Sequence, residues 1–202
     1  MTEADQIDRL IRDAFDARSL ERAATLTIEY YGPELLGFLT SHLHDPEAAS
    51  EVFADFSEAL WKALPAFEWR CSIRTFAYKL ARRTAGHYRK GARRRERLQL
   101  HPELSGAVDR LRTATAAYKR TDIQLRFQEL RAKLSEEDQM LLVLRVDRRL
   151  SWNELAEVAL AEEVSPDPKR LKAEAARLRK RFQLAKERLR TLVEEAGLLD
   201  QE

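Results

Sequence analysis

The residues with the clearest chemical meaning form one cationic stretch, residues 70–97. It contains eleven Lys or Arg and a single acid, Glu96. Closely spaced Lys and Arg bind the phosphates of a polyanion, and a neighbouring aromatic ring offers a face on which a base can stack. The alternative is a solvated cationic helix that binds nothing, and this stretch alone leaves both interpretations open.

The same stretch has a helical period. Its apolar positions match one face of an α-helix; they are Ile73, Phe76, Ala77, Leu80, Ala81, Thr84 and Tyr88. The opposite arc carries the cations, with Tyr78 set among them; these are Arg74, Lys79, Arg82, Arg83, Arg89 and Lys90. We therefore expect a helix that packs one side on a core and presents the other side to a polyanion.

A short loop with two aromatic rings, Pro65–Cys71, leads into this helix. Its residues Phe67, Glu68, Trp69 and Arg70 are candidates for binding a base, and the alternative is that both rings pack into the core. Cys71 is the only cysteine, so an internal disulfide is excluded. A lone cysteine is more often a small packing residue than a redox-sensitive group.

Charge is segregated along the chain. Residues 1–69 carry 14 acidic and 5 basic groups, although the whole protein has a net charge of +2. Asp45-Pro46-Glu47 is a helix start, and the helix that follows to Leu64 has an acidic stripe made of Glu51, Asp55 and Glu58. An acidic block before a basic block suggests one surface for a polyanion and another for a second partner. The alternative for the acidic stripe is a solvated face.

The elements that must position these residues are helices. Six Gly and six Pro are few for an all-β or nucleotide-binding α/β protein, so we expect an all-α fold. Helices are predicted over Glu3–Phe15 and over about Leu20–Leu43, where Pro33 is expected to kink or divide the helix. Periodicity weakens after Arg97. We therefore expect one domain at residues 1–97, a linker at 98–122 with one helix near Val108–Tyr118, and a second domain at 123–202.

Four helices are predicted in the second domain. The first is Ile123–Lys133. Ser135 opens a capping box at the start of the second helix, and Ser151 opens another at the start of the third, Trp152–Leu160. The last is a long basic helix that begins at Pro168, with Asp167 as its N-cap. Its apolar seam fits either a compact helix-turn-helix domain or a dimeric coiled coil. In a helix-turn-helix the second helix enters the major groove of DNA.

Other classes of function lack support. The four His have no acid or nucleophile at motif spacing, no metal-ligand spacing appears, and there is no Gly-rich phosphate loop. We therefore expect no enzymatic activity and no cofactor. The N-terminus is polar and acidic, and no apolar run approaches the ~20 residues of a membrane span. A cytoplasmic protein is expected.

Taken in order, these pieces resemble a bacterial RNA polymerase sigma factor of the small, two-domain extracytoplasmic-function (ECF) type. The stretch DPEAASEVFADFSEALWKAL matches the family's acid-rich helix, which starts at Asp-Pro-Glu and ends in Leu-Trp-x-Ala-Leu. IRTFAYKLARR is similar to the family's aromatic and basic helix. LSWNELAEVAL and LRKRFQLAKERL are similar to the two helices of its helix-turn-helix. The resemblance covers nearly the whole chain.

The resemblance implies a role for each group. Glu51, Asp55 and Glu58 would dock on the clamp of the largest polymerase subunit. Loop Phe67–Arg70 would take a base flipped from the melted −10 element, and helix Arg74–Lys90 would hold the single strand. The final helix would read the −35 element through Lys172, Arg177, Arg179, Lys180 and Arg181. Implied partners are core polymerase (clamp and flap), promoter DNA and an anti-sigma factor. The alternative is a dimeric helix-turn-helix regulator that acts without being a polymerase subunit.

The sequence departs from the family pattern at several positions. Ala54, Phe76, Arg83 and His87 stand where the family has Gln, Trp, Asn and Asp. The largest departure is Ala161–Ala176, sixteen residues where the family has a tight turn. Either the recognition helix extends backward by about three turns to Pro168, or the turn is a longer loop. We favour the extension, because Leu171 and Ala175 keep the register of the seam.

Overall fold

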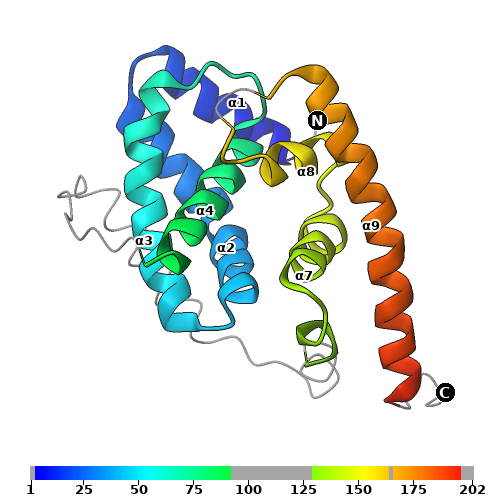
Figure 1. Ribbon diagram of the computed structural model, residues 1–202. Coiled ribbons are helices and arrows are strands. Elements are labelled where there is room, and N and C mark those ends of the chain that lie inside the picture. The colour runs from blue at the N-terminus through cyan, green and yellow to red at the C-terminus, as the bar shows by residue number, and fades with distance from the viewer. Residues whose placement is uncertain (1–2, 92–128, 164–165, 197–202) are drawn as a thin grey trace. The chain divides into compact units, whose positions relative to one another are not determined.

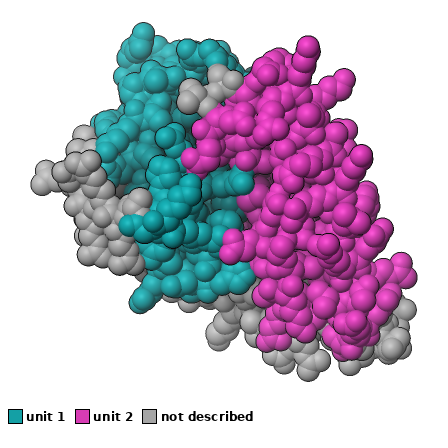
Figure 2. All heavy atoms as spheres, viewed as in Figure 1, with its two compact units in different colours: residues 1–117 teal, residues 118–202 magenta. Residues whose placement is uncertain are grey.

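The computed structural model describes residues 3–91, 129–163 and 166–196. The chain divides into two compact units, Met1–Ala117 and Tyr118–Glu202 (Figure 2). Every regular element in the described ranges is a helix, which confirms the all-α prediction. None of the described helices is long and apolar enough to cross a membrane. The predicted linker, the helix near Val108–Tyr118 and most of Ile123–Lys133 lie outside the described residues, so the predicted domain limits stay predictions.

Unit 1 contains four described α-helices and one short 3-10 turn (Figure 1). They are α1 (Glu3–Asp16), α2 (Leu20–Leu43), α3 (Pro46–Ala63), η1 (Leu64–Ala66) and α4 (Ile73–Arg89). Asp45 caps α3 as predicted, because its carboxylate accepts from the backbone N–H groups of Glu47 (2.8 Å) and Ala48 (3.2 Å). Pro33 lies inside α2 and does not divide it.

Helix α2 is the centre of this unit and packs on α1, α3 and α4. The fully buried core is aliphatic and aromatic and includes Ile28, Leu35, Phe38, Leu39, Val52, Phe53, Phe56 and Leu60. One polar contact ties α1 to α2: the Tyr31 hydroxyl donates to Asp8 Oδ1 at 2.5 Å. Burial, and then this hydrogen bond, raise the pKa of the Tyr31 phenol, so it stays protonated and remains a donor.

Besides a short helical stretch at residues 129–132, unit 2 has three described α-helices. They are α7 (Glu136–Leu142), which continues into a π-helical turn η2 (Val143–Asp147), α8 (Trp152–Ala159) and α9 (Pro168–Glu195). The predicted capping box of α8 is confirmed: Ser151 Oγ accepts from Glu154 N, and Glu154 Oε2 accepts from Ser151 N. Asp167 caps α9 through the N–H of Arg170.

Helix α9 begins at Pro168 and runs without a break, which confirms the predicted backward extension (Figure 1). Its seam is buried at Glu174, Ala175, Leu178, Ala185 and Val193, and the helix packs on both α7 and α8. Because the apolar side of α9 is already buried against α7 and α8, the packing favours a compact domain over a dimeric coiled coil. The order α8, connection, α9 is compatible with a helix-turn-helix.

Candidate nucleic-acid interface

Helix α4 is the basic helix that the sequence predicts. Ser72 begins it, because its Oγ accepts from the N–H of Thr75 at 3.1 Å. The buried side is narrower than the predicted apolar face and is rotated from it; it consists of Ile73, Thr75, Ala77, Tyr78, Ala81 and Ala85. Phe76, Leu80, Thr84 and Tyr88 are only half-buried.

The placement of Tyr78 among the outward cations was wrong. Its side chain is 0% exposed and meets Phe38 of α2 edge-to-face, with ring centroids 5.5 Å apart. The large ring is better accommodated in the apolar core than on the cationic side. A buried ring offers no face to a base, so Tyr78 is removed from the candidate site and belongs to the core.

The cations of α4 fall into two groups. Arg74 makes a bidentate pair with Glu34 of α2 at 2.7 and 2.9 Å, and Arg89 donates to the carbonyl of His42 at 2.7 Å. These two residues tie α4 to α2. Arg83 and Lys90 are exposed, whereas Lys79 and Arg82 are half-buried. Lys79, Arg83 and Lys90 follow one another at spacings of four and seven residues, so they share one side of the helix.

The loop between η1 and α4 packs its aromatic rings together. Phe67 is buried and stacks on Phe76 of α4, with centroids 4.3 Å apart, and Trp69 lies 4.9 Å from Phe67. This favours the core interpretation for Phe67. Trp69 is half-buried and has a positive φ of 57°. On either side of it, exposed Glu68 and Arg70 form an ion pair at 2.5 Å. Cys71 is half-buried and, as the single cysteine of the sequence, forms no disulfide within the chain.

The acidic stripe lies on α3, opposite its buried side. Val52, Phe53, Phe56 and Leu60 point into the core, whereas Asp55 is exposed and Glu51 and Glu58 are half-buried. Glu58 pairs with Lys62 one turn further on at 2.5 Å. The three acids are therefore presented on one surface of unit 1, as the sequence predicted.

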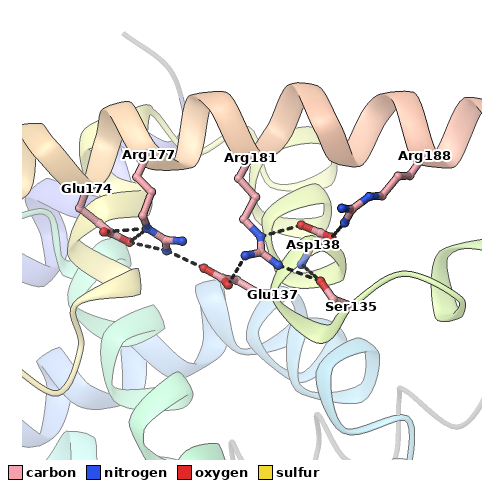
Figure 3. Close-up of polar contacts among 7 residues, drawn as sticks. All are labelled: Ser135, Glu137, Asp138, Glu174, Arg177, Arg181 and Arg188. Atoms are coloured by element: carbon pink, nitrogen blue, oxygen red, sulfur yellow. Dashed lines mark hydrogen bonds and ion pairs between the residues drawn. The ribbon is translucent and has the colours of Figure 1, made fainter.

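In unit 2, three arginines of α9 are paired with the first turn of α7 (Figure 3). Arg181 contacts Glu137 (2.6 Å), Asp138 (2.7 Å) and the Ser135 hydroxyl (2.9 Å). Arg188 reaches the second oxygen of Asp138 at 3.1 Å, and that carboxylate is only 1% exposed. These contacts hold α9 against α7.

Arg177 extends the same network. It pairs with Glu174 in its own helix and with Glu137 at 2.5 Å. Its hydrogen bonds to Glu174 and then Glu137 raise the pKa of Arg177. Thus Arg177 and Arg181, both predicted to contact DNA, are engaged within unit 2. Sequence reasoning missed their acidic partners, because it treated Glu136–Asp138 only as the start of a helix.

The other predicted cations of α9 face outward. Lys172, Arg179 and Lys180 are exposed. Arg179 also lies over the ring of Trp152 on α8, with its guanidinium carbon 5.7 Å from the ring centroid. Within the described part of the chain, Lys172 and Lys180 form no ion pair. They are the α9 cations best placed to meet phosphates.

Comparison with known proteins agrees with this geometry in unit 1. The family model for sigma-70 region 2 matches residues 27–95. That range spans most of α2, then α3, the aromatic loop and α4. A comparison with curated proteins gave no match. The chain therefore carries a sigma-70 region 2 domain at residues 27–95, which supports a sigma factor that acts with RNA polymerase in promoter recognition.

Proposed function

We propose that this protein is an ECF-type sigma factor, not itself an enzyme, that works in the cytoplasm. The observation that carries the proposal is the coincidence of the sigma-70 region 2 match with three adjacent features: the acidic face of α3, the aromatic loop and the cationic side of α4. One domain thus offers a surface for a protein partner and a separate surface for a nucleic acid strand.

In this proposal Glu51, Asp55 and Glu58 bind the clamp of core polymerase. The loop and the exposed cations of α4 bind the melted −10 strand, with Arg83 and Lys90 on its phosphates. Arg74 and Arg89 position α4, because both are anchored to α2. Trp69, half-buried beside Glu68 and Arg70, is the ring of this loop best placed to meet a base.

The second domain, proposed as residues 123–202, is a region 4-like helix-turn-helix. Its α9 would lie in the major groove at the −35 element, with Lys172, Arg179 and Lys180 toward DNA. We assign Arg177 and Arg181 to positioning α9 on α7. The polymerase flap and an anti-sigma factor remain proposed partners of the protein. The packing of the α9 seam on α7 and α8 argues against a dimeric regulator.

The polymerase-binding surface can be tested by reversing its charge. Glu51→Lys combined with Asp55→Lys should weaken binding to core polymerase by about 100-fold, because like charges placed together at an interface cost several kcal/mol. Affinity would be measured with labelled protein and purified core enzyme. The matched control reverses one exposed acid in each unit, Asp13→Lys with Glu162→Lys, and should leave affinity nearly unchanged. Equal affinity of the double variant and the wild type would remove the clamp role.

A further inference from the structure

Helix α1 lies outside the matched sigma-70 region 2 range, yet it contacts the aromatic loop. Phe15 meets Trp69 edge-to-face with ring centroids 5.6 Å apart. Arg12 places its guanidinium carbon 4.8 Å from the centroid of the same indole. Two side chains three positions apart on one side of α1 therefore hold one residue of the loop.

Trp69 needs such support because of its backbone. A φ of 57° is in the left-handed region, which a bulky residue adopts rarely and keeps only where its surroundings hold it. The indole N–H is buried and meets no acceptor among the described residues. The ring is thus held by Phe15, Arg12 and Phe67, and its N–H makes no hydrogen bond within the described part of the chain.

The conformation of Trp69 decides how its neighbours are presented. Glu68 and Arg70, the residues before and after Trp69, are exposed and form an ion pair with each other. If Trp69 leaves its position, the backbone of the whole loop is free to change. The contact with α1 therefore sets the shape of the surface between α3 and α4.

We infer that α1 is a positioning element for the strand-binding loop, and that Arg12 and Phe15 act through Trp69 on capture of the melted −10 strand. This inference rests on the proposed function, since it assigns a task to the same loop. Neither Arg12 nor Phe15 is proposed to touch DNA. Their effect is to keep the loop in the one conformation that presents Trp69, Glu68 and Arg70 together.

The test uses holoenzyme assembled from core polymerase and the full chain. The probe is the single-stranded non-template −10 oligonucleotide of a promoter found by transcription from a fragment library.

Phe15→Ala should weaken oligonucleotide binding about tenfold, because the energy of an aromatic pair corresponds to a roughly tenfold change in an equilibrium constant. Arg12→Ala should weaken it less, and Arg12→Lys should restore part of the loss because a cation again lies over the ring. Arg9→Ala, exposed on the same helix, should stay within about twofold of wild type.

A double-mutant cycle with Trp69→Ala separates positioning from a general loss of stability. If α1 acts through the indole, Phe15→Ala has no further effect once Trp69 is alanine. An equal loss in both backgrounds, or no loss in either, would overturn the inference. Should Phe15→Ala fail to fold, Arg12→Ala carries the same cycle, because Arg12 is exposed and leaves no cavity. If wild-type holoenzyme neither transcribes nor binds the strand, the proposed function itself fails. If the wild type is active and the Phe15 and Arg12 variants bind the strand equally well, only the inference about α1 fails.

Discussion

Replacing Arg181 by alanine is expected to destabilise unit 2 by about 2–3 kcal/mol, because a buried carboxylate loses its closest charged partner. Among the described residues, Arg188, whose side chain is 61% exposed, would be the one cation left beside Asp138, and Glu137 and Ser135 would each lose one contact. Arg181→Lys should recover little, since one ammonium group cannot reproduce the guanidinium contacts to three side chains. Hydrogen exchange of α7 amides in the full chain would report the change directly.

The adjacent residue provides the control. Lys180 is exposed on α9, and Lys180→Ala should change the stability of unit 2 by less than about 0.5 kcal/mol while weakening duplex −35 binding by the holoenzyme. The two variants are therefore expected to separate helix positioning from DNA contact. If Arg181→Ala left α7 protection unchanged and reduced −35 binding as Lys180→Ala does, the division of α9 cations would be incorrect.

Reversing the charge of Arg83 and Lys90 together is expected to abolish open-complex formation while leaving affinity for core polymerase intact. Both residues are exposed, Arg83 on α4 and Lys90 at the C-cap of the same helix, and a reversed charge repels the strand that a cation would hold. The substitution Arg83→Ala is milder. It should reduce the slope of log K for single-strand binding against log salt concentration by about 0.7 in magnitude, the value expected for one lost phosphate contact. Permanganate reactivity of the −10 region would measure melting.

The control for this charge reversal uses exposed cations elsewhere in unit 1. Arg9→Glu with Arg22→Glu changes the net charge by the same amount on α1 and α2. If that control melts the promoter normally and the Arg83 and Lys90 variant does not, the loss of melting is due to the position of these two cations and not to the change in net charge. Loss of core binding by the latter would place these residues at the polymerase interface and contradict the proposal.

Local patterns in the sequence predicted the helices well. Asp45, Ser151 and Asp167 cap helices as expected, because N-cap chemistry depends on residues only two or three positions apart. The extension of α9 to Pro168 also followed from a cap and from a seam that keeps its register. Helical period is a property of one segment, so it can be found without knowledge of the rest of the fold.

Contacts between distant segments were not predictable in the same way. Period alone placed Tyr78 among cations, whereas Phe38, forty residues earlier, provides the core surface that covers it. Likewise nothing in the spacing of α9 said that Arg181 would meet Asp138 across 43 residues of sequence. The available signal was the excess of acids at Glu136–Asp138 beside a helix rich in arginine. This pattern shows that the two segments have complementary charge, but it does not say whether the arginines bind the acids of another helix or the phosphates of DNA.

The extended α9 also explains the division of its cations. Arg177, Arg181 and Arg188 are spaced by four and seven residues, so they share one side of the helix next to the buried seam. That side meets the acidic first turn of α7. Lys172 and Lys180 lie on other sides of the helix and are exposed. A long helix can thus be held by one row of cations and bind a polyanion with the others.

The most direct test of the central claim is transcription in vitro with core RNA polymerase on a library of genomic fragments. With this protein added, discrete transcripts should start from fragments that share two separated sequence motifs, and core enzyme alone should give none of them. The Glu51→Lys, Asp55→Lys variant should lose all of these transcripts. Absence of any specific start with the wild-type protein, combined with tight binding of the free protein to duplex DNA as a dimer, would contradict the account.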